Sequence, residues 1–191
     1  MIWINQQQEQ GISHEQMSLI KDLRFLMTQF AYLTRDYIKS IIYNLGDSAA
    51  IANKLHNIPL KIKALVDMIF GASTGDELIN LLLKNVSYLE DIVNAMLFGH
   101  FSFMYDSIKY FYHNADALAK YFAQINPYWD ESQWKKLLYI YNEDLINDTN
   151  AIISRSFKDE LDMFDKLLQD ALAIADYLAE GINQYSAAQK K

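Results

Sequence analysis

The chain has 191 residues, of which 51% are hydrophobic and 21% are charged, and this balance is typical of a folded globular protein. Six glycines and two prolines are few for the many turns of an all-β fold, so we expect helices. The net charge of −7, without a Lys/Arg run longer than two residues, argues against nucleic-acid binding. The absence of cysteine excludes disulfides, thiolate metal sites and a cysteine nucleophile.

The longest stretch without formal charge, residues 92–105, is shorter than the roughly 18 apolar residues that a membrane span needs. The first ten residues, "MIWINQQQEQ", lack the basic flank and apolar core of a signal peptide. We therefore expect a cytoplasmic protein. Residues 1–12 are expected to form a flexible Gln-rich arm, residues 13–186 a single domain, and residues 187–191 a C-terminal tail.

Seven helices are predicted from the spacing of apolar residues and from residues that cap or break helices. The first covers residues 13–46 and begins at a capping box in which Ser13 pairs with the glutamine three residues later. Two short helices follow, over residues 47–56 and 60–70, because Pro59 is expected to separate them.

Four further helices are predicted from apolar stripes together with start or stop signals. Thr, Asp or Ser residues that can cap a helix precede three of them, and glycine or Asn-Pro marks their ends. Their ranges are 74–98, 102–125, 130–152 and 156–181. The fold class is therefore expected to be all-α, an antiparallel bundle of long helices with short connecting helices.

An offset of 56 residues aligns the predicted helix 74–98 with the predicted helix 130–152 through a handful of identical residues. Two amphipathic helices can share this much by chance, so an internal duplication and a chance likeness both stay open. Under this offset Asn85 is equivalent to Tyr141.

No catalytic signature is found in the chain. The stretch "GASTG", residues 71–75, lacks the Lys-Ser/Thr of a phosphate-binding loop and is interpreted as a helix stop followed by a cap. None of the four histidines has a glutamate three residues earlier, as a di-iron site in a helical bundle requires. His113 and Asp116 are one turn apart, but two ligands do not make a site. We expect no enzyme activity, no cofactor and no metal.

Two polar residues, Asn85 and Tyr141, fall on apolar helix faces. One interpretation is a hydrogen bond in the core that sets the register of neighbouring helices. The other is a pocket between the helices, lined by Phe30, Asn85 and Tyr141.

Three segments resemble a family of small helical proteins from Gram-positive spore-forming bacteria. They are "LTR" (33–35), "NADALAKYFAQINPYW" (114–129) and "MFDKLLQDALAIADYLAEGINQY" (163–185). The likeness extends from about Arg24 to Tyr185. The family is functionally uncharacterised, and its members are often labelled acetylglutamate kinase. That label implies an α/β fold with glycine-rich phosphate-binding turns, which this sequence does not support.

The resemblance also implies a histidine on each of three helices, at the positions that Phe30, Asn85 and Tyr141 occupy here. Three inward-facing histidines would suggest a metal or ligand site, and their replacement argues against a metal in this chain. The residues that do match the family pattern are Thr34, Arg35, Asn114, Asp116, Asp165, Asp176 and Gly181.

Four of these matching residues lie at the edges of apolar stripes: Arg35, Asn114, Asp116 and Asp176. A charge so placed needs a partner, because an unpaired buried charge is not tolerated. We expect a partly buried cluster in which Arg35 bridges one or two carboxylates and Asn114 adds a donor. The alternative is a set of unrelated, solvated charges.

The sequence thus predicts a non-catalytic interaction or structural protein, with a bundle that binds a small ligand or metal in a central pocket as the alternative. An inward pocket would favour the second and a fully packed centre the first. A protein partner and a homo-oligomer both stay open, whereas anionic membranes should repel the acidic surface. The candidate ligand-binding residues are Phe30, Arg35, Asn85, Asn114, Asp116, Tyr141 and Asp176.

Overall fold

The computed structural model describes residues 13–190, and within this range it contains six α-helices and no strand. The helices are α1 (His14–Tyr43), α2 (Ser48–Phe70), α3 (Gly75–Phe98), α4 (Phe101–Ile125), α5 (Glu131–Ile153) and α6 (Phe157–Gln189). The predicted all-α bundle of long helices is confirmed. The N-terminal arm predicted for residues 1–12 lies outside the described range.

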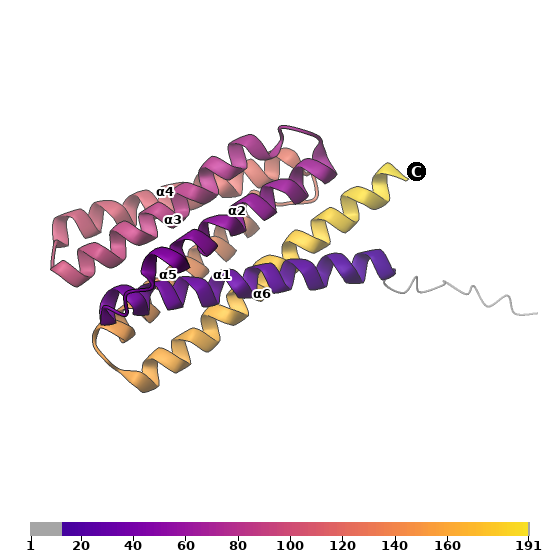
Figure 1. Cartoon of the computed structure of the whole chain (residues 1–191). Coiled ribbons are helices and arrows are strands. Elements are labelled where there is room, and N and C mark those ends of the chain that lie inside the picture. Colours follow the sequence, from indigo (N-terminus) through magenta and orange to yellow (C-terminus); the bar gives the residue numbers. More distant parts are fainter. Residues whose placement is uncertain (1–12, 191) are drawn as a thin grey trace, which may run out of the picture.

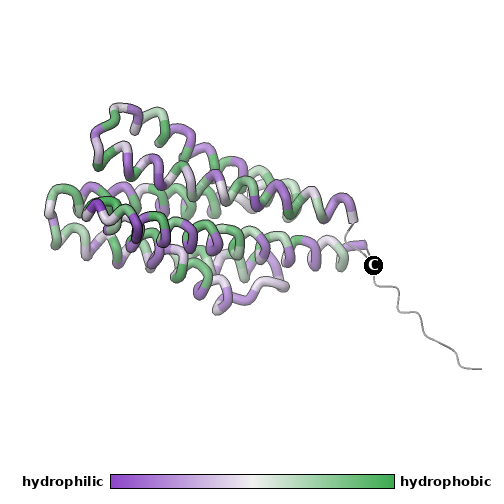
Figure 2. Tube along the Cα trace, turned by 90° about the horizontal axis from the view of Figure 1, so that it is seen from below, coloured by the Kyte–Doolittle hydropathy of each residue, from purple (hydrophilic) through white to green (hydrophobic). Residues whose placement is uncertain are grey.

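The six helices form a closed ring. Each helix packs against the next one along the chain, and α6 packs back against α1 (Figure 1). Helix α1 also contacts α3 and α5, so some contacts cross the ring in addition to those between neighbouring helices. Hydrophobic and hydrophilic residues alternate along every helix (Figure 2), and the hydrophobic ones join in one core. The apolar face of each amphipathic helix therefore points to the inside of the ring.

Helix α2 runs through Pro59 without ending, so the predicted pair of short helices, 47–56 and 60–70, is wrong. Proline in a helix interior costs about 3 kcal/mol because it removes one backbone hydrogen bond and crowds the preceding turn. Burying one aliphatic side chain contributes roughly 1.5–3 kcal/mol, and four lie buried along α2 on both sides of the proline. These are Leu55, Ile58, Ile62 and Val66. Burial of the whole stripe outweighs the proline.

Helix α6 continues to Gln189, so the predicted helix end near Gly181 is wrong, and residues 187–189 of the predicted tail are helical. Gly181 serves close packing instead of helix termination. A Cβ atom added there would lie 1.9 Å from Nε1 of Trp129. That indole nitrogen donates a hydrogen bond to the carbonyl of Tyr177 over 3.1 Å.

Two of the predicted helix caps form as expected. At the start of α1, Ser13 Oγ accepts a hydrogen bond from the Gln16 amide, and the Gln16 side chain accepts one from the Ser13 amide in return. At the start of α5, the Asp130 carboxylate accepts a hydrogen bond from the Gln133 amide over 2.8 Å. Both satisfy amides that a helix start leaves without partners.

Two other predicted caps do not form. The Thr74 hydroxyl before α3 donates to the carbonyl of Phe70 over 3.3 Å, and the Ser156 hydroxyl before α6 donates to Asp159 over 2.5 Å. Neither side chain accepts a hydrogen bond from a helix amide. A Ser or Thr before a helix can bond in several ways, and the geometry of the preceding turn selects one of them.

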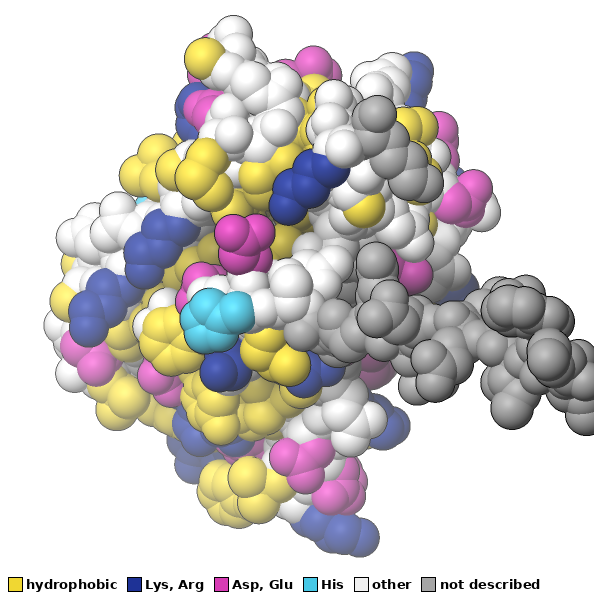
Figure 3. All heavy atoms as spheres, turned by 90° about the vertical axis from the view of Figure 1, so that its right-hand side faces the viewer, with side chains coloured by type: hydrophobic (Ala, Val, Ile, Leu, Met, Phe, Trp, Pro, Cys, Tyr) yellow, Lys and Arg dark blue, Asp and Glu magenta, His cyan; other side chains and the backbone are white. Residues whose placement is uncertain are grey.

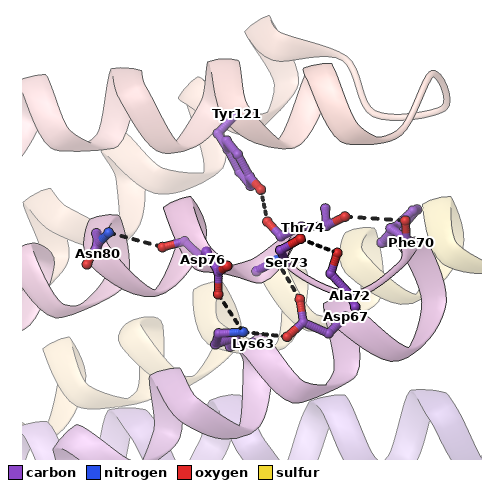
Figure 4. Close-up of polar contacts among 10 residues, drawn as sticks. Lys63, Asp67, Phe70, Ala72, Ser73, Thr74, Asp76, Asn80 and Tyr121 are labelled. Atoms are coloured by element: carbon purple, nitrogen blue, oxygen red, sulfur yellow. Dashed lines mark hydrogen bonds and ion pairs between the residues drawn. The ribbon is translucent and has the colours of Figure 1, made fainter.

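The connection between α2 and α3 is tied down by side chains instead (Figure 4). Lys63 binds the carboxylates of Asp67 and Asp76, the latter at 2.9 Å. Asp67 also accepts a hydrogen bond from the Gly75 amide over 2.6 Å. The hydroxyl of Tyr121 on α4 donates to the backbone of the same turn. The "GASTG" stretch is therefore a structural junction of three helices.

The pairs α3–α4 and α5–α6 resemble each other beyond the helices compared in the sequence. Buried, half-buried and exposed side chains follow one another in the same order in residues 111–125 of α4 and 171–185 of α6. This repeated order in α4 and α6 favours an internal duplication over a chance likeness, the two interpretations that the sequence left open.

The described surface mixes charges of both signs. Basic, acidic and hydrophobic side chains are interspersed at the end of the bundle where α1 begins and α6 ends (Figure 3). Among the helices of residues 13–190, none combines the length and the hydropathy required to cross a membrane.

Candidate functional site

A cavity of about 60 Å³ lies inside the ring, and every one of the six helices contributes to its wall. Most lining side chains are aliphatic or aromatic, and none is charged. The lining residues are Met27, Phe30, Ile58, Pro59, Ile62, Leu82, Asn85, Leu118, Phe122, Trp134, Leu138, Tyr141, Asn142, Ile174 and Leu178. A mostly apolar cavity with a few polar groups is the usual form of a small-molecule site.

Phe30, Asn85 and Tyr141, predicted to line one pocket, all lie in this wall. The rings of Phe30 and Tyr141 are neighbours, with centroids 6.3 Å apart. The Asn85 side-chain oxygen accepts a hydrogen bond from Asn114 over 3.3 Å, and Asn114 also donates to the Leu81 carbonyl over 2.9 Å. Asn85 thus combines both interpretations drawn from the sequence: it links α3 to α4, and it lines a pocket.

Three lining side chains on α5 carry polar atoms that have no hydrogen-bond partner among the described residues. They are Nε1 of Trp134, the hydroxyl of Tyr141 and the side-chain nitrogen of Asn142. The three residues are 0%, 3% and 2% exposed. Leaving a buried donor unsatisfied costs about 1–3 kcal/mol, so three in one wall are an unusual concentration.

Trp134 and Asn142 were not among the sequence candidates. Trp134 lies two helical turns before Tyr141, and Asn142 directly follows it. The shared apolar stripe was visible in the sequence, but nothing in the sequence distinguishes a tryptophan with a satisfied N–H from one without.

Burial raises the pKa of Tyr141 far above its ordinary value, and the nearby carboxylates of Asp170 and Asp148 raise it further. The hydroxyl therefore stays protonated and remains a donor at any physiological pH. Burial and the adjacent carboxyl of Asp144 raise the pKa of Asp170 to about 6.

Arg35 lies outside the cavity wall, in a buried group of charges that we call the Arg35 cluster: Arg35 and Lys39 of α1, Asp148 of α5 and Glu160 of α6. Arg35 binds Glu160, and Lys39 Nζ lies 2.8 Å from the same carboxylate. Asp148 is fully buried without a hydrogen-bond partner for either oxygen. Burial raises its pKa to about 6, an effect that the positive charge of Arg35 partly opposes.

The predicted cluster of Arg35 with Asn114, Asp116 and Asp176 is wrong. Helix α1 packs mainly on α2 and α6, and α4 lies across the ring from it, so Arg35 meets Glu160 of α6. Asn114 on α4 bonds to α3 instead.

The two carboxylates of the predicted cluster have partners of their own. Asp116 lies 2.7 Å from Lys135 Nζ and accepts a hydrogen bond from Tyr139 over 2.9 Å. Asp176 accepts two hydrogen bonds from Arg24, over 2.6 and 2.7 Å. Both pairs are partly exposed and lie away from the cavity wall.

No three His, Asp or Glu side chains come together as a potential metal site in the part of the chain that the structure describes. Comparison with family models, with curated proteins and with solved structures yields no match. The resemblance to the spore-former family therefore stays a prediction from the sequence.

Proposed function

We propose that this protein binds a small molecule inside its helical ring and is not an enzyme. The observation that carries the proposal is a cavity walled by all six helices, in which three buried polar atoms have no protein partner. Of the two functions predicted from the sequence, an inward pocket supports the ligand-binding one. The charged candidates Arg35, Asp116 and Asp176 lie outside the wall, so they are not proposed as ligand contacts.

The size of the cavity limits the ligand. An engineered apolar cavity of roughly 150 Å³ holds benzene, and one water molecule takes up roughly 30 Å³ of liquid. A cavity of about 60 Å³ therefore suits a molecule smaller than benzene. A nucleotide or a flavin would require the ring to open.

The chemistry of the wall supports binding without catalysis. General acid–base and nucleophilic catalysis need a carboxylate, imidazole, amine, thiol or activated hydroxyl at the reacting atoms. The wall holds neither a charged side chain nor a histidine, and the hydroxyl of Tyr141 is held protonated. Asn85 and Asn142 can orient a ligand but do not exchange protons.

A cavity-filling variant tests the proposal. Leu82→Phe adds volume to the wall, whereas Leu161→Phe makes the same change at a side chain that is 60% exposed and outside the wall. Fragments smaller than benzene would be screened by ligand-observed NMR. Saturable binding that Leu82→Phe abolishes and Leu161→Phe retains is the expected result. Binding to both variants alike, or to neither variant nor the native chain, would refute it.

One observation favours a second candidate, the interaction protein predicted from the sequence. The turn between α3 and α4 carries four aromatic side chains that are each more than half exposed. They are Phe98, Phe101, Phe103 and Tyr105. Exposed apolar patches often mark protein contacts. Light scattering over a range of concentrations would detect self-association, and Phe98→Ser with Phe101→Ser should abolish it. A native chain that is monomeric at every concentration would contradict a homo-oligomer.

A further inference from the structure

Resting on the proposed function, we propose that the ligand is an uncharged molecule with one hydrogen-bond-accepting oxygen on a small apolar body, such as a short ketone or amide. Its oxygen is held at the part of the wall formed by the consecutive residues Tyr141 and Asn142 of α5. Its apolar body lies against the aliphatic wall.

The ligand is expected to be uncharged because no charged side chain lines the cavity. A charged ligand would lose its hydration without gaining an ion partner, which is costly in an apolar environment. The charges nearest to Tyr141 are the carboxylates of Asp170 and Asp148, which raise the pKa of its hydroxyl. Their negative field would also repel a carboxylate or a phosphate.

The need for an acceptor follows from the unpartnered atoms. An indole N–H can only donate a hydrogen bond, and the hydroxyl of Tyr141, which stays protonated, also has a proton to donate. The amide of Asn142 can turn to offer either its nitrogen or its oxygen. Two donors, Trp134 and Tyr141, therefore call for an acceptor from whatever occupies the cavity, and an ammonium group would find no carboxylate in the wall to pair with.

The spacing along α5 separates the two donors. Trp134 and Tyr141 are seven residues apart, which is roughly 10 Å along a helix axis, and Leu138 lies between them in the wall. One small oxygen cannot reach both donors. Tyr141 and Asn142 form the end with two polar groups, so this end takes the oxygen, and Leu138 and Trp134 contact the apolar body.

Three probes of the same branched shape test this assignment: acetone, acetate and isobutene. Each would be titrated into the full ¹⁵N-labelled chain while the indole N–H signals are followed. Trp134 reports on the cavity, and Trp129, whose Nε1 donates to Tyr177 and whose ring centroid lies 5.7 Å from that of Trp134, reports how far a change spreads beyond the wall. The matched variants are Tyr141→Phe and Tyr110→Phe, since Tyr110 is 53% exposed and outside the wall. Removing an unpartnered hydroxyl should leave the fold intact.

We expect acetone to shift the Trp134 signal saturably and acetate to leave it unchanged. Losing one neutral hydrogen bond should weaken acetone binding about three- to tenfold in Tyr141→Phe and leave it unchanged in Tyr110→Phe. Isobutene should bind more weakly than acetone, and neither variant should change its affinity.

The failures can be told apart. If isobutene binds as tightly as acetone, or if acetate binds best, the ligand class is wrong and the proposed function stands. If Tyr141→Phe leaves acetone affinity unchanged, the assignment to that end of the cavity is wrong. If none of the probes gives a saturable shift and fragment screening is also negative, the cavity holds only water and the proposed function fails with the inference.

Discussion

The ion pair of Arg35 is more deeply buried than the ion pairs of Asp116 and Asp176. The Glu160 side chain that binds Arg35 is 4% exposed, whereas those of Asp116 and Asp176 are 39% and 45% exposed. Exposed ion pairs contribute roughly 0–1 kcal/mol, and removing one member of a buried pair costs about 3–5 kcal/mol. Stability should therefore depend on the Arg35 cluster far more than on the two surface pairs.

Arg35→Met should lower the free energy of unfolding by about 3–5 kcal/mol, because it leaves the buried Glu160 carboxylate with Lys39 alone. Adding Glu160→Leu should cost less than the sum of the single changes, since the buried Glu160 carboxylate is then no longer present without Arg35. Chemical denaturation measures both effects. Arg24→Met, which breaks the exposed pair with Asp176, is the control, and an equal loss from the two arginines would contradict the buried cluster.

Asp148 should make stability depend on pH. Its pKa rises from 3.8 to about 6 on folding, so the folded chain holds this proton more tightly than the unfolded chain. The contribution of Asp148 is therefore most favourable below about pH 4, declines as the pH rises to about 6, and is level above it. Asp148→Asn should remove this decline, which amounts to about 2 kcal/mol between pH 4 and 7.

The measurement is the difference in unfolding free energy between Asp148→Asn and the native chain at a series of pH values. Asp162→Asn, an exposed change on α6, should leave the pH profile unaltered. A difference for Asp148→Asn that does not vary with pH would show that the carboxyl is not perturbed.

Gly181→Ala should destabilise the chain by up to about 2 kcal/mol. Alanine gains about 1 kcal/mol over glycine in a helix, but its methyl group would overlap the indole of Trp129, and overpacking costs about 1–3 kcal/mol. In a Trp129→Phe background the ring is smaller, so the cost should shrink. Denaturation of the four chains checks this, and an undiminished cost would place the strain elsewhere.

At the scale of single helices, the sequence predicted the positions of the helices well and their ends less well. Five of the six helices match a predicted segment, and only Pro59 led to a false division. Of the predicted caps, Ser13 and Asp130 bond to helix amides and Thr74 and Ser156 do not. Side-chain identity permits a cap, and the incoming backbone decides whether it forms.

This difference should be measurable by removing one cap of each kind. Asp130→Ala should cost about 1 kcal/mol, because the Gln133 amide loses its acceptor. Thr74→Ala should cost much less, since its hydroxyl bonds only to the Phe70 carbonyl at 3.3 Å. Amide hydrogen exchange should also quicken at the start of α5 alone. Equal losses of stability from the two changes would contradict the distinction.

At the scale of the whole molecule, closure of the ring brings all six helices to one cavity. Helices far apart in sequence, such as α1 and α6, become neighbours, while α1 and α4 end up across the ring (Figure 1). Helices α4 and α6 share the order of buried and exposed side chains over residues 111–125 and 171–185. Asn85 and Tyr141, equivalent under the 56-residue offset, both face the cavity.

A ring of this kind gives no support to the acetylglutamate kinase label carried by the family that the sequence resembles. The kinase fold that this label implies binds phosphate at glycine-rich turns with converging backbone amides, and the described residues contain instead helices around a cavity of about 60 Å³. Millimolar ATP or N-acetylglutamate should leave the melting temperature unchanged. Saturable stabilisation by either compound, measured by differential scanning calorimetry, would overturn this prediction.

The sequence by itself determined the all-α class, most helix positions and three residues of the cavity wall: Phe30, Asn85 and Tyr141. Hydrophobic periodicity carries this information, because the inward face of an amphipathic helix can be identified without knowing its neighbours. Polar residues on such a face are conspicuous for the same reason.

Only the tertiary structure decided which faces meet. The partners of Arg35, Asp116 and Asp176, the unsatisfied donors of Trp134 and Asn142, and the close packing at Gly181 all depend on the order of helices around the ring. The physical reason is that hydrogen bonds and ion pairs act over a few ångströms between helices distant in sequence. Local patterns show that a polar side chain needs a partner, and ring closure selects the partner.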